Sequence, residues 1–227
     1  MTDMNDFSGY VRDGNNEKVA EILRGPVIEL TWNDAHPIKM AIDHHNDKAF
    51  ELIVNSGWYN GSVLTSFQFL LEFAIVAANV FVVRFMLEHG HAVVSKDLVS
   101  VVISEINDAY EREEDPKEIT NYVEILQCLL DHGGLDHEGD LATTLWDTTI
   151  SMHVDDRVII PLIEAGISPF LKNPTSSRVT FYEYVRYLHK REGNQLRLLN
   201  HIRKHQTLFA VVLYQRLDAL KHLVKEQ

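Results

Sequence analysis

The chain has 227 residues, of which 45% are hydrophobic and 24% charged, so it has enough apolar residues to form a folded core and is not expected to be disordered. Its 21 basic and 33 acidic side chains give a net charge of −12, which argues against binding to nucleic acids or to an anionic membrane surface, because both need basic residues. No apolar stretch approaches the roughly 20 residues that cross a bilayer.

The remaining bulk features indicate the compartment and the kind of partner. The first residues lack the basic and then apolar pattern of a secretory signal. A single cysteine, Cys128, excludes an internal disulfide and fits a reducing environment. We therefore expect a cytoplasmic protein. Its acidic charge would steer a basic protein partner toward it, although acidic charge can also serve solubility alone.

Five segments with helical apolar periodicity recur along the chain, and each ends in a glycine. The glycines lie 32, 33, 43 and 33 residues apart, and glycine suits the left-handed position that follows a helix. The segments are residues 15–25, 46–57, 79–90, 121–133 and 154–166, closing at Gly25, Gly57, Gly90, Gly133 and Gly166.

A second set of helices is predicted between these segments. Twelve residues after the first four glycines stand Pro37, Phe69, Val102 and Leu145, and each is expected to open a further helical run. Proline is well tolerated in the first turn of a helix. The chain is thus predicted to consist of repeating helix pairs.

Residues 32–57 carry a resemblance to a known family. His36-Pro37-Ile38 stands where ankyrin repeats have threonine-proline-leucine, and Ala41 follows at the family's small residue. The chain thus resembles a degenerate ankyrin-repeat protein. The resemblance implies an all-α solenoid of about five to six repeats, forming one domain over residues 1–227.

The ends of the chain are predicted to be divergent capping units. Residues 7–25 resemble an ankyrin unit without its hairpin. Residues 170–227 depart from the repeat pattern, with a helix pair over 180–205 and a final helical element over 207–226. Another α-solenoid, such as a tetratricopeptide-like array, or an irregular helical bundle is the alternative fold.

The fourth repeat is longer than the others by about ten residues, in the charged segment 110–121. This segment is predicted to be either a solvated loop or one additional turn on each flanking helix. The alternative is an acidic protrusion that contacts a basic partner.

No pattern of catalytic or metal-binding residues emerges. None of the twelve histidines has the spacing of a known metal site, and a lone cysteine excludes cysteine-based zinc sites. His89 and His132 precede closing glycines, where each can meet exposed helix carbonyls. Cys128 falls on an apolar stripe and is expected to be a buried thiol. There is no P-loop and no nucleophile elbow, so we expect neither an enzyme nor a cofactor.

The candidate protein-binding residues come from the resemblance, which implies a concave face made of loops ("fingers") and inner helices. Trp32, Trp58 and Tyr59 would be aromatic anchors, or would pack one loop against the next, whereas Trp146 suits the core. The loop candidates are Trp32, Asn33, Asp34, Trp58, Tyr59, His91, Asp136, His137, Glu138 and Asp140, and the inner-helix candidates include Lys39, Asp43, Glu72, Glu105 and Asp147.

The sequence therefore predicts a non-catalytic module that binds a basic protein, for instance an inhibitor, immunity or antagonist protein. Two alternatives stay open. One is a metal-dependent or other enzyme on the same helices, and the other is a scaffold subunit of a larger assembly. Self-association is neither indicated nor excluded.

Overall fold

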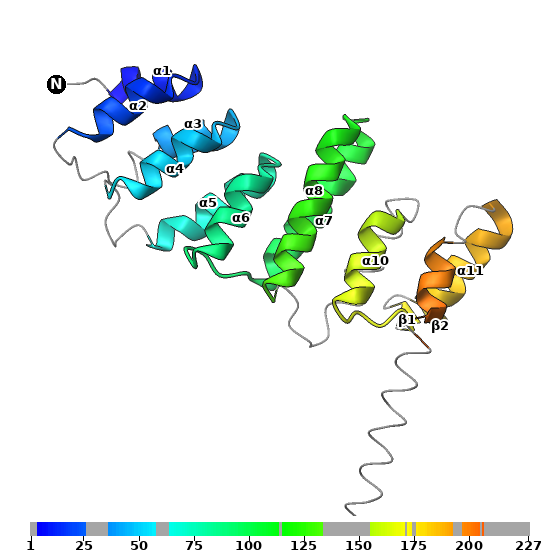
Figure 1. Cartoon of the computed structure of the whole chain (residues 1–227). Coiled ribbons are helices and arrows are strands. Elements are labelled where there is room, and N and C mark those ends of the chain that lie inside the picture. Colours follow the sequence, from blue (N-terminus) through cyan, green and yellow to red (C-terminus); the bar gives the residue numbers. More distant parts are fainter. Residues whose placement is uncertain are drawn as a thin grey trace, which may run out of the picture. The chain divides into compact units, whose positions relative to one another are not determined.

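The computed structural model describes residues 4–25, 36–57, 64–113, 115–133, 155–170, 172–173, 176–192, 197–204 and 206 (Figure 1). Backbone contacts divide the chain into two compact units, Met1–Asp136 and His137–Gln227, called unit 1 and unit 2. The prediction of one continuous repeat domain depends on residues 134–154, which lie outside the described residues.

The described part of unit 1 consists of helices that follow one another in four pairs (Figure 1). The pairs are α1 (Met4–Arg12) with α2 (Asn16–Leu23), α3 (His36–Asp43) with α4 (Asp47–Asn55), α5 (Leu64–Val76) with α6 (Val80–Glu88), and α7 (Lys96–Glu111) with α8 (Pro116–Asp131).

The pairs stack so that the first helices of each pair form one layer and the second helices another. Contacts join α1 to α3, α3 to α5 and α5 to α7, and likewise α2 to α4, α4 to α6 and α6 to α8. We call the first layer the inner helices and the second the outer helices. The helical character and the helix pairs predicted from the sequence are confirmed in this unit.

The outer helices begin after a side chain that caps their first turn. Asn15, Asn46 and Asn79 accept hydrogen bonds through Oδ1 from the backbone N–H three residues later, at 3.1–3.2 Å. Asp115 and Asp155 cap α8 and α10 (Asp156–Glu164) in a similar way. Such side chains satisfy donors that the first helical turn leaves without an intrahelical partner.

Two of these asparagines also tie neighbouring pairs together. The Asn46 Nδ2 donates to the Val11 carbonyl of the preceding inner helix at 2.8 Å, and the Asn79 Nδ2 donates to the Ile42 carbonyl at 3.1 Å. Asn79 is 1% exposed. The same side chain therefore starts one helix and satisfies the end of another.

The closing glycines follow the prediction at four of the five repeats. Gly57, Gly90, Gly133 and Gly166 have φ values between 66° and 114°, which is the left-handed region that favours glycine. Gly25 is the exception, because its φ lies outside that region.

The predicted starts of two inner helices are wrong. The helix α3 begins at His36, next to Pro37 as expected, but α5 begins at Leu64 and α7 at Lys96, so Phe69 and Val102 lie inside their helices. Apolar residues surround α5 on most sides, and the first side chain before α7, Ser95, makes no cap hydrogen bond. The start of α5 follows from no apolar periodicity, whereas Ser95 and Asp97 do mark the start of α7 and were overlooked. Leu145 lies outside the described residues.

The charged segment 110–121 lengthens both helices of the fourth pair. The helices α7 and α8 have 16 residues each and end and begin within it, which leaves only residues 112–115 between them. The interpretation as additional helical turns is confirmed, and the interpretation as a solvated loop is wrong.

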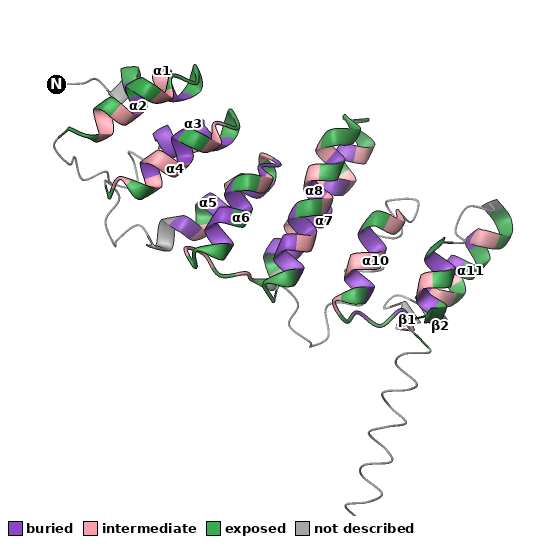
Figure 2. Ribbon diagram, viewed as in Figure 1, coloured by how far each residue is buried: buried purple, intermediate pink, exposed green. Residues whose placement is uncertain are grey.

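Buried side chains line the sides of the helices that face their neighbours (Figure 2). Cys128 is a buried free thiol on α8, as predicted. Burial raises the pKa of this thiol. Among the described residues, no helix has the length and apolar character to span a bilayer.

In the described residues of unit 2, the helix α10 is followed by a short hairpin and a further helix pair. The helix α11 (Phe181–Glu192) and a helical stretch at 197–204 confirm the helix pair predicted over 180–205. The strands β1 (Lys172–Asn173) and β2 (Ser176–Thr180) pair antiparallel and were not predicted. Thr180 and Glu183 cap α11 reciprocally, since Glu183 Oε2 accepts from the Thr180 N–H at 2.8 Å and Thr180 Oγ1 accepts from the Glu183 N–H at 3.3 Å.

Candidate protein-binding surface

Most of the predicted loop residues fall outside the described residues. Their role in binding stays a prediction. They are Trp32, Asn33, Asp34, Trp58, Tyr59, Asp136, His137, Glu138 and Asp140, together with Asp147 and Leu145 of the fifth repeat.

His91, the described member of that set, packs against neighbouring rings. Its ring stacks on Phe67 of α5 at a centroid distance of 4.9 Å and lies 5.9 Å from Phe85 and 6.0 Å from His89 of the preceding turn. Burial, and then the neighbouring His89, lower the His91 pKa. His91 is half-exposed, so it holds the loop on α5 while part of its ring stays accessible.

The next residues of this loop also follow α5. The Val93 N–H donates to Gln68 Oε1 at 3.4 Å, and Val93 itself is 77% exposed. Two consecutive residues of α5 thus contact this loop: Phe67 contacts His91, and Gln68 contacts Val93. The loop after α6 and the N-terminal half of α5 therefore form a continuous surface.

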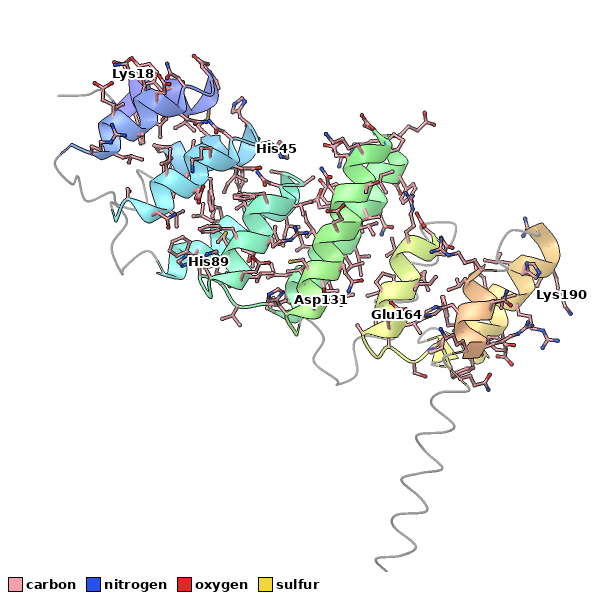
Figure 3. All side chains as sticks on the ribbon, in the orientation of Figure 1. Lys18, His45, His89, Asp131, Glu164 and Lys190 are labelled. Atoms are coloured by element: carbon pink, nitrogen blue, oxygen red, sulfur yellow. The ribbon has the colours of Figure 1, made fainter. Side chains whose placement is uncertain are left out.

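His89 and His132 end their helices as predicted. The Nδ1 of each lies 2.8 Å from the carbonyl oxygen four residues earlier, Phe85 for His89 and Cys128 for His132. Figure 3 shows His89 at the C-terminal end of α6 and Asp131 at the corresponding end of α8, whereas His45 lies at the opposite, turn end of its pair. The His89 and His132 side chains thus contact backbone carbonyls at the C-terminal ends of α6 and α8.

The inner-helix candidates of unit 1 lie on the accessible sides of their helices. Asp43 and Glu72 are exposed, and Lys39 and Glu105 are half-exposed. The Lys39 Nζ lies 4.9 Å from the centroid of the Phe69 ring, and Glu105 is 3.9 Å from Arg112. Carboxylates therefore lie on the accessible sides of these inner helices, and their role in binding stays a prediction.

Exposed apolar side chains that were not predicted from the sequence lie on the same surface. Phe69 is 44% exposed and Val76 is 50% exposed, and both lie on the side of α5 that faces away from the core, with Phe73 half-exposed between them. Phe69 was predicted to open its helix, but it lies inside α5, on the side opposite the buried Leu70 and Leu71. The matching spacing of Ile38, Ala41 and Ile42 with Leu71, Ala74 and Ile75 is a sequence signal that could have placed Phe69 on the accessible side.

Two shallow hollows lie on other surfaces of unit 1. One runs between the outer helices α2 and α4 and is lined by Ala20, Arg24, Lys48 and Leu52. The other lies beside the lengthened fourth pair and is lined by His45, Ala78, Asp115, Lys117, Glu118 and Asn121. Within the described ranges, no three His, Cys, Asp or Glu side chains gather as metal ligands would.

Three comparisons, with protein-family models, with curated proteins and with solved structures, find no match to this chain. The assignment of its repeats therefore depends on the periodicity and the helix contacts of the chain itself.

Proposed function

We propose that this chain is a non-catalytic protein-binding module with an ankyrin-type arrangement of helix pairs, and that its partner is a basic protein. The observation that carries the proposal is the accessible side of the inner helices α3, α5 and α7, here called the inner-helix face. Exposed carboxylates and exposed apolar side chains lie together on this face.

Three local features support an ankyrin-type arrangement. The helix pairs recur at intervals of 32 or 33 residues, except at the lengthened fourth pair, and stack in two layers in unit 1. Most of the described pairs close on a left-handed glycine. The loop after α6 lies against the inner helix of its own pair, where ankyrin-type fingers would extend the inner-helix face.

The charge of the face supports a basic partner. The helices α3, α5 and α7 contain six carboxylates and two lysines, Lys39 and Lys96. Opposite charge on a partner would raise the association rate and exclude acidic competitors. An inhibitor or antagonist that covers the basic surface of a nucleic-acid-handling enzyme in the cytoplasm is the role we propose within this class.

The test is affinity capture from a native extract, identification of the bound protein, and reconstitution of the complex from purified components. We expect Asp43→Lys with Glu72→Lys to weaken the reconstituted complex by about tenfold or more. Trp58→Ala and Asp136→Lys probe the loop side of the same surface and are expected to weaken it as well.

The matched control changes charge by the same amount on the outer helices, through Glu88→Lys with Glu124→Lys, both of which are exposed. This variant is expected to bind normally. Equal losses in both double variants would show a general charge effect, and no loss in the Asp43, Glu72, Trp58 and Asp136 variants would refute the proposed face.

A further inference from the structure

We infer that the inner-helix face accepts a peptide segment with two or three large apolar side chains flanked by lysine or arginine, and that these apolar side chains sit on α5. The inference depends on the proposed function and names the chemistry of the segment that the partner would present.

The first step is an apolar ridge along α5. Phe69, Phe73 and Val76 stand four and three residues apart, which places them on one side of a helix. The opposite side carries the buried residues Leu70, Leu71, Ala74 and Ile75. At about 1.5 Å per residue the ridge is roughly 10 Å long, which suits two or three side chains of one segment.

The second step is the position of the carboxylates beside this ridge. The buried triplets Ile38, Ala41, Ile42 and Leu71, Ala74, Ile75 align α3 with α5. This alignment sets Asp43 level with Val76. The buried pairs Leu71, Ala74 and Ile103, Ile106 align α5 with α7 in the same way and set Asp108 level with Val76.

Since α3 and α7 both pack against α5, this alignment of buried residues places the exposed carboxylates Asp43 and Asp108 on either side of the Val76 end of the ridge. Glu72, also exposed, lies on α5 itself between Phe69 and Val76. An apolar segment without basic residues would bring no countercharge to these groups, and a basic segment without apolar residues would leave the ridge in water.

The third observation is that a cation of the protein itself already lies over the ridge. The Lys39 ammonium lies over the Phe69 ring, 4.9 Å from its centroid. A cation over an aromatic face is attracted by the ring quadrupole. The face therefore combines apolar and cationic groups within the protein itself, and a partner segment of the same composition would extend that arrangement.

The outer helices offer a comparison. Phe81 of α6 is 40% exposed, close to the value for Phe69, but its ring packs against Phe85 at 6.1 Å. Nearby outer-helix charges pair with each other, as Lys48 does with Glu51 at 2.9 Å. Phe81 therefore makes a matched control with similar exposure on the other layer.

The experiment is a selection of random displayed peptides of about 16 residues on the immobilised full chain at about 50 mM salt, where charge attraction is weakly screened. We expect the enriched peptides to combine a net positive charge with at least two of Leu, Ile, Phe and Met. Absence of enrichment, or enrichment of acidic or purely polar peptides, would overturn the inference.

The most enriched peptides are then synthesised and titrated by fluorescence anisotropy. We expect Kd to rise about tenfold or more with Phe69→Ser/Val76→Ser, because about half of each side chain would be buried by the segment. A similar rise is expected with Asp43→Asn/Glu72→Gln/Asp108→Asn. Phe81→Ser is expected to change Kd by less than about twofold. Equal Kd values for the wild type and the Phe69→Ser/Val76→Ser variant would contradict the inference.

The two proposals fail separately. A reconstituted cellular complex lost with Asp43→Lys/Glu72→Lys but unchanged by Phe69→Ser/Val76→Ser would keep the proposed function and reject the apolar ridge. Selected peptides that depend on the ridge, without any captured partner, would keep the ridge chemistry and leave the proposed function unsupported.

Discussion

The buried side-chain amide of Asn79 makes two hydrogen bonds that link neighbouring helix pairs. Its Oδ1 caps α6, and its Nδ2 satisfies the Ile42 carbonyl at the end of α3. We expect Asn79→Ala to lower the free energy of unfolding by about 2 kcal/mol, since it removes a helix cap and one of the two hydrogen bonds that the Ile42 carbonyl accepts, the other coming from the His45 N–H at 3.1 Å. Urea denaturation would measure this change.

Asn15 is the matched control for Asn79. It caps α2 through the same kind of bond but is exposed. Asn15→Ala is therefore expected to cost only about 1 kcal/mol. Equal losses at the two positions would mean that the bond to the Ile42 carbonyl contributes nothing.

His91 makes stability depend on pH. Burial and the nearby His89 hold its pKa below the ordinary value of 6.5, so the unfolded chain binds a proton more readily than the folded one. This contribution to stability is present above pH 6.5 and is lost as the pH falls through the lower folded-state value. We expect His91→Phe, which keeps a ring on Phe67, to flatten the decline in unfolding free energy below pH 6.5.

Thermal unfolding followed at several pH values would test this expectation. His44→Phe is the control, because His44 is exposed and outside the ring stack. If the His91→Phe and His44→Phe proteins lost stability equally on acidification, the stack would not be the source of the dependence.

At the scale of helices, the turns between paired helices contain strained residues. Glu113 has a φ of 52° between α7 and α8 and is exposed. A side chain in this conformation costs about 1–2 kcal/mol, whereas glycine adopts it readily but loses more chain entropy on folding. We expect Glu113→Gly to stabilise the protein by about 0.5–1 kcal/mol, measured by chemical denaturation.

A glycine substitution at Glu111, the last residue of α7, is expected to change stability in the opposite direction. Glu111→Gly places glycine in a regular helix and is expected to destabilise by about 0.5–1 kcal/mol. Destabilisation by both substitutions would show that the left-handed φ at Glu113 imposes no strain.

The helices differ in how far the sequence determined their prediction. The outer helices were predicted well because an asparagine or aspartate at one end and a glycine at the other make strong boundaries, as in α4 and α6. The inner helix α5 lacks such a boundary, so its start was placed at Phe69 and not at Leu64. The hairpin β1–β2 was missed because its strands are two and five residues long and mostly polar.

The candidate surface was predicted less completely than the helices. The end positions of His89 and His132 followed from local chemistry and are confirmed. The exposed Phe69 and Val76 were not found, because exposure on an apolar helix depends on helix phase, and phase is set by packing against α3 and α7. Local sequence carries little of that information.

At the scale of the whole molecule, the net charge of −12 should govern how fast a basic partner binds. Raising salt from about 50 to 500 mM is expected to lower the association rate by about tenfold or more and to change the dissociation rate much less. Stopped-flow mixing with the reconstituted partner or a selected peptide would measure both rates. An association rate independent of salt would count against charge steering.

The lengthening of α7 and α8 shows where the molecule tolerates added chain. The additional residues extend both helices at their joined end, while the opposite end of the pair keeps Gly133 in the same left-handed conformation as Gly57 and Gly90. The turn between these helices, whose described residues Arg112, Glu113 and Asp115 are exposed, can therefore be lengthened without moving the stacked part of the pair. It is a suitable place to attach a fluorophore or a purification tag when the inner-helix face has to stay free.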